Sequence, residues 1–373
     1  MSKQNYYSVK NILSTNSDYN LLLGERSNGK SYSVKYLALW QAYHECDYND
    51  FLQNGKMTKI DEYEFGYLRR WRDERKSQDV ERYFADMPIE KITDKEYSCV
   101  KFYRGDFYFA NIDENGKVKR GKKIGSAFAL TSETHYKSLS YPKISTIIFE
   151  EFLTKSGYLP HEVDNLLSII STIARRRYVR VFMIGNTINR MCPYFDEWQL
   201  THVKKQEQGT IDIYKQPTSQ IDENGNNIVV SIAVEYCENS GSNSKMFFGQ
   251  KSKMTTSGAW ESDSYPHLQE PFNTYKCVYK IYYEYNSFKF IICLMQNKNN
   301  EPFLYVYPAK ERGKIKRVVS NKFNIDRYTT LYLQNLSKYD TIVNELISNQ
   351  KIVYSDNLTG TEFNQIKKER GRF

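Results

Sequence analysis

The sequence YNLLLGERSNGKS, from Tyr19 to Ser31, decides the fold class of this chain. Its first residues form an apolar run that predicts a short buried strand, and Gly24 to Ser31 is a complete G-x-x-x-x-G-K-S pattern. A helix is predicted from about Ser31 to His44, so the pattern lies between a strand and a helix. Glycines let backbone N–H groups turn toward phosphate oxygens, and the helix N-terminus adds its positive dipole end. The segment therefore predicts a phosphate-binding loop.

This loop predicts a nucleotide site in which the residues have separate roles. Lys30 is expected to reach the β- and γ-phosphates, which makes it a catalytic residue, and Ser31 is expected to bind Mg²⁺. The predicted cofactors are therefore ATP and Mg²⁺. The predicted nucleotide-binding residues of the loop are Gly24, Glu25, Arg26, Ser27, Asn28, Gly29, Lys30 and Ser31.

A second motif, ISTIIFEE from Ile144 to Glu151, is an apolar strand that ends in two acids, which is a Walker B arrangement. The first acid, Glu150, is predicted to hold magnesium together with Ser31. The second, Glu151, is predicted to polarise the attacking water, which indicates a hydrolase rather than a kinase. Asp is usual where this chain has Glu150. The alternative interpretation of the pair is two solvated acids at the end of a strand.

Two further polar positions complete the predicted site. The run Arg175 to Arg177 ends a predicted amphipathic helix, where it either complements the helix dipole or supplies an arginine finger to a neighbouring subunit. Asn186 follows the predicted strand Val179 to Ile184 and is a candidate sensor of the γ-phosphate and part of the nucleotide site. An ordinary strand-to-turn residue is the alternative for Asn186.

Composition narrows the class of protein. The chain has 373 residues, and its apolar runs are of strand length, too short to span a bilayer, so no membrane partner is expected. The N-terminus shows no secretory signal. Six cysteines without CxxC spacing favour free thiols in a reducing cytoplasm over zinc or disulfides. A net charge of +9 favours a polyanionic partner, although solubility explains it equally well.

The order of predicted elements divides the chain into three parts. Residues 1–205 alternate strands and helices, which predicts an ASCE-type P-loop ATPase domain with a mostly parallel α/β sheet. Residues 206–270 are rich in turn-forming residues and are predicted to be a linker with one strand, Ile228 to Val234. Residues 271–373 have a β-β-β-α-β order that predicts a smaller α/β domain.

Further elements are predicted from local patterns. Pro160 is expected to open a helix that runs to about Ala174. Its buried face is predicted to comprise Val163, Leu166, Leu167, Ile170 and Ile173. The remaining predictions are strands at 64–71, 126–130, 145–149, 275–284, 288–295, 302–307 and 352–354, a hairpin at 100–119 and a helix at 340–349.

Together, these motifs resemble the genome-packaging ATPases of phi-29-like phages, relatives of the large terminases. The resemblance covers about the first 200 residues, and it rests on the segments Tyr19–Gly24, Tyr67–Arg70, Lys137–Ser138, Tyr141–Pro142, Ser145–Phe152, Tyr158–Pro160, Glu162–Val163, Gly185–Asn186 and Pro193–Phe195. It implies an ATP-driven motor that moves double-stranded viral DNA into a procapsid. The implied partners are that DNA, the portal (connector) of the procapsid, other copies of the chain in a ring, usually a pentamer, and, as a candidate, a packaging RNA. The implied location is the host cytoplasm, with transient residence at the portal vertex.

The resemblance also implies roles for single residues. Arg175 becomes the trans-acting finger, Lys137 a second trans-acting basic residue of the nucleotide site, and Arg72 a candidate DNA contact. Glu150 in place of Asp and a long insert between positions 47 and 62 depart from the family pattern.

The C-terminal order resembles the ribonuclease-H-type nuclease domain of large terminases. Such a nuclease gathers several acids around two metals, and the predicted first strand, Tyr279 to Glu284, has no Asp at its centre. We therefore expect a ribonuclease-H-like fold without nuclease activity.

Arg26 raises a separate hypothesis about coupling. A long cation inside the loop is predicted to pair with Glu151 and to hold it off the attacking water until DNA engages. A plain phosphate contact by Arg26 is the alternative.

Other classes of protein share part of this pattern. A helicase or another ring DNA translocase would share the ATPase motifs but lack the second domain. A P-loop kinase or small-molecule ATPase would not need DNA for full turnover.

Overall fold

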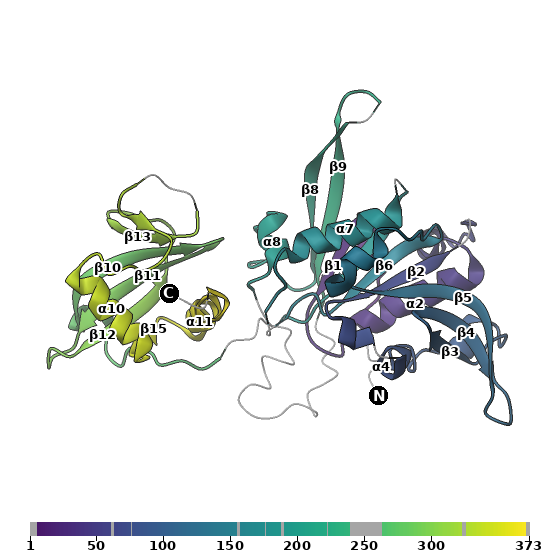
Figure 1. Cartoon of the computed structure of the whole chain (residues 1–373), viewed down its shortest axis with the longest axis horizontal. Helices are drawn as coiled ribbons and strands as arrows, with labels where there is room; N and C mark the ends of the chain where they lie inside the picture. The colour runs from purple at the N-terminus through teal and green to yellow at the C-terminus, as the bar shows by residue number, and fades with distance from the viewer. Residues whose placement is uncertain are drawn as a thin grey trace. The chain divides into compact units, whose positions relative to one another are not determined.

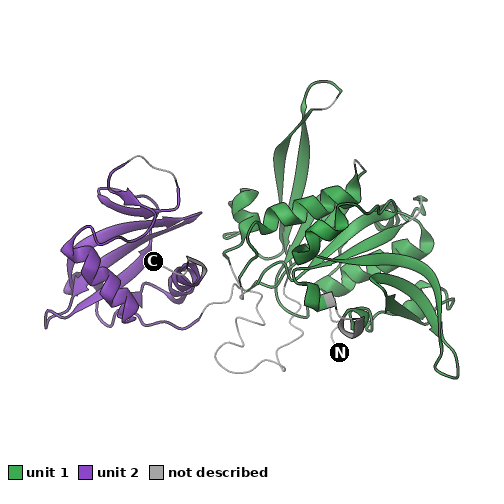
Figure 2. Ribbon diagram, in the orientation of Figure 1, with its two compact units in different colours: residues 1–260 green, residues 261–373 purple. Residues whose placement is uncertain are grey.

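The computed structural model of the chain describes residues 6–60, 63–75, 77–154, 157–175, 177–187, 190–221, 223–238, 263–322 and 326–370. The chain forms two compact units, residues 1–260 and 261–373 (Figure 2). In these described ranges, no helix is long and apolar enough to cross a bilayer.

A large sheet forms the frame of the first unit, and in the described residues its strand order is β3-β4-β5-β2-β6-β7-β1-β9-β8 (Figure 1). The inner strands from β5 to β9 in this order pair in parallel, and the outer pairs β3–β4, β4–β5 and β8–β9 are antiparallel. The strands are β1 (Tyr19–Leu23), β2 (Glu64–Arg69), β3 (Cys99–Tyr103), β4 (Asp106–Ile112), β5 (Val118–Ala129), β6 (Ile144–Glu150), β7 (Arg180–Ile184), β8 (Thr210–Ile221) and β9 (Asn227–Tyr236). The predicted mostly parallel α/β sheet is confirmed.

Helices cover both faces of this sheet because its inner strands are apolar on both sides. Side chains alternate along β1: Leu22 packs into one core cluster with α2, and Leu21 and Leu23 pack into a second cluster with α7. The helices are α1 (Lys10–Ser14), α2 (Lys30–His44), α3 (Tyr48–Asn54), α4 (Ser77–Arg82), α5 (Ile89–Ile92), α6 (Glu133–Tyr136), α7 (Glu162–Ala174) and α8 (Pro193–Glu197).

The predicted buried face of α7 needs one correction. Leu167 is 41% exposed, while Ile169, which was not predicted, is 1% exposed. The other four predicted positions are buried. The helix begins at Glu162, two residues after Pro160, and this shift at its start does not change the face that packs on β6.

The predicted linker is wrong for the residues that form β8, whereas the one strand predicted within it, Ile228 to Val234, is confirmed as part of β9. Strand β9 pairs in parallel with β1, from Tyr19 opposite Ile232 to Leu23 opposite Tyr236, and β8 returns antiparallel to β9. The reason is burial, since β9 supplies an apolar stretch, residues 232–234, that completes the sheet beside β1. Polar turn residues dominate only the exposed end of this hairpin, which projects from the sheet in Figure 1. Residues 239–262 of the predicted linker lie outside the described residues.

The second unit is a smaller mixed sheet with the order β14-β13-β10-β11-β12-β15 in its described residues. Its elements are β10 (Lys276–Tyr285), β11 (Phe288–Gln296), β12 (Pro302–Pro308), β13 (Arg317–Ser320), β14 (Thr329–Thr330), α10 (Lys338–Ser348), β15 (Ile352–Tyr354) and α11 (Asn357–Arg370). The predicted second, smaller sheet is confirmed, and β13, β14 and α11 are additional elements. Arg317, in a basic stretch, is buried and pairs with Asp340 at 3.4 Å.

Candidate nucleotide-binding site

The phosphate-binding loop lies where β1 ends and α2 begins. Gly24 and Gly29 have φ values of 145° and 98°, which L side chains rarely adopt. A Cβ at Gly29 would also lie 3.3 Å from the backbone nitrogen of Tyr7. Glycine is therefore favoured at both positions by the backbone conformation, and at Gly29 also by the close approach of the N-terminal segment.

Lys30 is buried at the first position of α2. Its ammonium group donates to the carbonyl oxygen of Glu25 and to Oδ1 of Asn28, the latter at 3.1 Å. Burial lowers the pKa of Lys30, against the opposing fields of Cys237, Glu150 and Glu25. The lysine is thus held inside the loop, as its predicted role requires.

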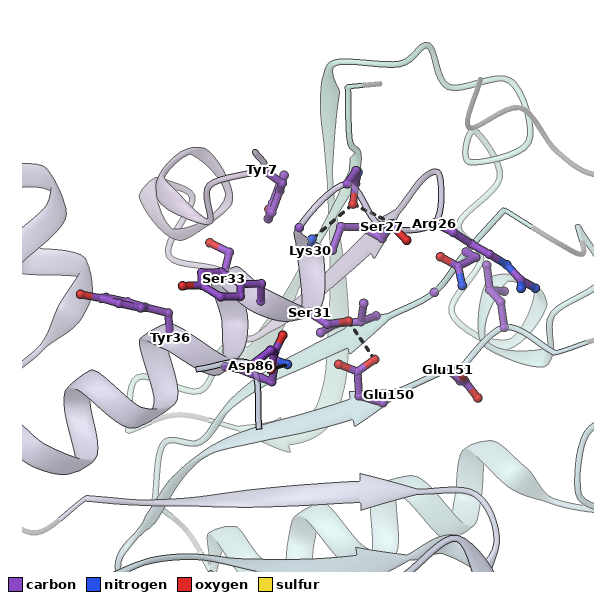
Figure 3. A pocket seen from close by; sticks show the side chains of 18 of the residues that line it. Tyr7, Arg26, Ser27, Lys30, Ser31, Ser33, Tyr36, Asp86, Glu150 and Glu151 are labelled. Carbon is purple, nitrogen blue, oxygen red and sulfur yellow. Dashed lines mark hydrogen bonds and ion pairs between the residues drawn. The ribbon is translucent and has the colours of Figure 1, made fainter. Parts of the chain in front are cut away.

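Glu150, the last residue of β6, faces Ser31 across the start of the loop helix (Figure 3). The Ser31 hydroxyl donates to Oε2 of Glu150 at 3.2 Å. The Tyr83 hydroxyl donates to Oε1 of the same carboxylate at 2.6 Å. Burial raises the pKa of Glu150, and the hydrogen bonds from Tyr83 and Ser31 act in the opposite direction. Tyr83 belongs to no sequence motif and was not predicted.

Glu151 has a different environment from its neighbour. Its backbone is left-handed, with φ at 55°, and its side chain is 64% exposed. Nη2 of Arg69 lies 3.0 Å from the Glu151 carboxylate and 3.1 Å from the Glu74 carboxylate. The prediction that Glu151 pairs with Arg26 is therefore wrong. Glu151 pairs with Arg69, because β2 lies directly beside β6 in the sheet.

A buried ion pair supports the segment that follows Glu151. Arg70 donates from Nε and Nη2 to the two carboxylate oxygens of Glu162, each at 2.9 Å. Its Nη1 and Nη2 also donate to the carbonyl oxygens of Glu151 and Phe152, at 3.0 and 2.7 Å. Tyr194 adds a hydrogen bond to Glu162 at 3.0 Å. Arg70 therefore fixes the backbone on which the predicted catalytic carboxylate stands.

Lys30, Ser31, Arg70, Glu150 and Glu151 line one cavity of about 1110 Å³. Of the predicted nucleotide-binding residues, those that line it are Arg26, Ser27, Asn28, Gly29, Lys30, Ser31, Glu150, Glu151 and Asn186. Gly24 and Glu25 shape the loop behind this lining. Aromatic residues that the sequence did not single out also line the cavity, namely Tyr6, Tyr7, Tyr32, Tyr36, Tyr48 and Trp71.

Arg175 and Lys137 do not line the cavity. Arg175, at the C-terminus of α7, donates from Nη2 to the carbonyl of Leu139 at 2.7 Å. Lys137 pairs with Glu133 at 2.9 Å and is 57% exposed. Because Leu139 lies two residues from Lys137, the two cations occupy the same exposed part of the first unit. Arg72 is also exposed, and its backbone N–H donates to Thr131.

The residues present fit a magnesium nucleotide. Nδ2 of Asn28, within the loop, is a buried donor without a hydrogen-bond partner among the described residues. Ser31 and Glu150 supply the hard oxygen ligands that Mg²⁺ prefers. The same cavity holds Lys30 and Glu151.

Residues 1–216, more than half of the 373-residue chain, match the family described as Podovirus DNA encapsidation protein (Gp16). The chain belongs to this family. Two Gp16-type relatives, the DNA packaging proteins of Bacillus phages PZA and phi29, are each 33% identical to it over 199 residues, 52% of this chain and 50% of the relative. The chain spans about half the length of the relatives that it matches. A chain of the solved bacteriophage Phi-29 viral genome packaging motor assembly has the same fold, with 20% identity, 98% coverage of both chains and a TM-score of 0.52.

Membership of the Gp16 family confirms the resemblance that the motifs indicated. The matched residues include the loop, β6 with its two acids, and α7, so the family match and the cavity concern the same unit. The roles of single residues stay predictions.

Proposed function

We propose that this Gp16-family chain is an ATP-hydrolysing motor that drives double-stranded DNA into a procapsid. The observation that carries the proposal is the single cavity that joins a complete phosphate-binding loop to Glu150 and Glu151 at the end of β6. The names of the relatives, DNA packaging proteins, support the DNA substrate.

In this mechanism, the backbone N–H groups of residues 24–31 hold the phosphates and Lys30 reaches the β- and γ-phosphates. Ser31 and Glu150 would hold Mg²⁺, which neutralises charge on the phosphate oxygens when bound. Glu151 orients the attacking water and accepts its proton. Arg69 sets the resting position of the Glu151 carboxylate. Asn186, two residues after β7, lines the cavity and would sense the γ-phosphate of a bound nucleotide.

The working unit that we propose is a ring of identical chains, a pentamer by resemblance, on the portal of a procapsid in the host cytoplasm. Arg175 and Lys137 would each act on the nucleotide of a neighbouring subunit. Their exposure outside their own cavity supports this role. A packaging RNA is a further candidate partner of the ring.

The test is the ATPase rate of the purified chain alone, with double-stranded DNA, with procapsids, and with both. The proposal expects a magnesium-dependent rate that is highest with both partners, together with protection of DNA inside the procapsid. A rate that DNA stimulates and procapsids leave unchanged would favour another ring translocase. A rate that neither changes would favour a small-molecule ATPase.

A further inference from the structure

Tyr83 lies in no motif, but it contacts both Glu150 at the end of β6 and Lys35 on the loop helix α2. It follows α4 and donates its hydroxyl proton to Oε1 of Glu150 at 2.6 Å, across 67 residues of sequence. Its ring lies 4.5 Å, between centroids, from the ring of Tyr67 on β2. The ammonium group of Lys35 lies 4.9 Å from the centroid of the Tyr83 ring. The ring therefore has defined neighbours, which restrict where the hydroxyl can point.

The backbone of Tyr83 is tied to the loop helix. Lys35, one turn after Ser31 on α2, is buried, and its Nζ donates to the carbonyl oxygen of Tyr83 at 2.8 Å. The same ammonium group pairs with the carboxylate of Asp86. A short segment, residues 83–86, thus bridges the helix that carries Lys30 and Ser31 to the strand that carries Glu150.

Glu150 is the residue for which such a bridge matters. A glutamate has one more rotatable bond than an aspartate, so its carboxylate can take more positions in a site of fixed geometry. With Tyr83 on Oε1 and Ser31 on Oε2, both oxygens have a donor.

We propose that Tyr83 is a positioning residue for Glu150, and that its hydroxyl aims the carboxylate at the magnesium of a bound nucleotide. This inference rests on the proposed function, because it presupposes a Mg²⁺–nucleotide complex in the cavity. It extends that function by explaining how the long side chain of Glu150 is held in one position. Outer partners of this kind commonly change metal affinity by about tenfold or more.

The test uses the full-length chain with the substitution Tyr83→Phe, which keeps the ring and removes the hydroxyl. Binding of a fluorescent, non-hydrolysable ATP analogue is measured in EDTA and over a Mg²⁺ titration. We expect the affinity of Tyr83→Phe in EDTA to equal that of the unsubstituted chain. The factor by which Mg²⁺ raises the affinity should be about tenfold smaller in Tyr83→Phe. Tyr43→Phe is the matched control, because Tyr43 also donates to a glutamate, Glu96 at 3.1 Å, but Glu96 does not line the cavity, whereas Glu150 does.

A second measurement separates positioning from folding. In a Glu150→Ala background, Tyr83→Phe should cause no further loss of the Mg²⁺-dependent gain, since the group that it positions is gone. Three outcomes would overturn the inference. Tyr83→Phe could gain as much affinity from Mg²⁺ as the unsubstituted chain, or lose affinity equally with and without Mg²⁺. Tyr83→Phe could also reduce the Mg²⁺-dependent gain just as much when Glu150 is already alanine. Absence of any Mg²⁺-dependent binding in the unsubstituted chain would instead overturn the proposed function on which it rests.

Discussion

Glu150 and Glu151 are adjacent residues with opposite environments. Glu150 is 7% exposed and accepts two hydrogen bonds, whereas the Glu151 side chain is 64% exposed and meets Arg69. The left-handed backbone at Glu151, with φ at 55°, turns the chain at the end of β6. A non-glycine residue in this conformation costs on the order of 1 kcal/mol, which the surrounding contacts must offset. A buried acid suits a metal ligand, and an exposed acid can reach water.

Substitutions in the loop and at Glu151 should separate binding from hydrolysis. Lys30→Ala should lose nucleotide binding or turnover, because it removes the buried ammonium group that the phosphate-binding loop holds at the start of α2. Glu151→Gln should bind ATP normally and hydrolyse it roughly 10²- to 10⁴-fold more slowly, the usual contribution of a general base. Phosphate release and nucleotide binding are measured on each variant. Glu207→Gln, on an exposed glutamate outside the cavity, is the control, and full activity in Glu151→Gln would remove that residue from catalysis.

A second prediction at the residue scale concerns Glu235 on β9. Burial raises the pKa of Glu235 to about 7, Glu238 adds to the rise, and the hydrogen bond from Tyr7 opposes it. Because the folded-state pKa lies above the unfolded value, this carboxyl favours folding at low pH and loses that contribution as the pH rises through 7.

Glu235→Gln should therefore become more stable than the unsubstituted chain as the pH rises. The difference in the free energy of unfolding should be small near pH 5 and approach at most about 3 kcal/mol above pH 8. Chemical denaturation at a series of pH values measures it, with Glu207→Gln as the control. A constant difference across the series would contradict a raised pKa.

At the scale of elements, β2 organises the end of β6. Its last residue and the residue after it are arginines with different partners: Arg69 meets the side chain of Glu151, and Arg70 holds the carbonyl groups of residues 151 and 152. Both reach these groups because β2 pairs in parallel with β6, so the carboxyl ends of the two strands lie side by side. Arg70 also anchors α7 through Glu162, so one side chain joins β2, β6 and α7.

Arg70→Ala should strongly destabilise the first unit. It leaves the Glu162 carboxylate, 0% exposed, without its ion pair, and breaking a buried pair in this way costs about 3–5 kcal/mol. Lys122→Ala removes a more exposed pair, with Glu45, and should cost about 1 kcal/mol or less. Thermal or urea unfolding compares the two, and equal costs would show that the Arg70 pair adds nothing beyond a surface pair.

At the scale of the whole molecule, the first unit holds the complete cavity, while two predicted site residues, Arg175 and Lys137, lie outside it. Such an arrangement is expected if another subunit supplies these cations. In the second unit, the described residues include no group of three His, Cys, Asp or Glu side chains that could hold a metal ion. Its lack of nuclease activity and its ribonuclease-H-like character stay predictions.

Mixing experiments test whether Arg175 acts across a subunit interface. Arg175→Ala and Lys30→Ala chains should each be inactive and should recover part of the ATPase rate when mixed. Recovery is expected because some interfaces then pair an intact loop with an intact arginine. Co-assembly is checked with differently tagged chains. If confirmed mixed rings stay inactive at every ratio, Arg175 acts within its own subunit or serves only to cap α7.

The sequence by itself determined the features that depend on neighbouring residues. The loop from Gly24 to Ser31, the strand that ends in Glu150, and the helix α2 follow from patterns of a few consecutive residues, and the family match covers all of them. Local patterns suffice here because glycine conformation, strand periodicity and helix initiation each depend on only a few consecutive residues.

Only the tertiary structure decided which distant residues meet. Glu151 pairs with Arg69, 82 residues away, rather than with Arg26, and Glu150 meets Tyr83. The strand predicted within the linker becomes β9, and only the structure shows that it pairs with β1 and that β8 pairs with it. These contacts depend on strand order, and strand order follows from how buried apolar faces pack together over long sequence distances, which no local pattern specifies.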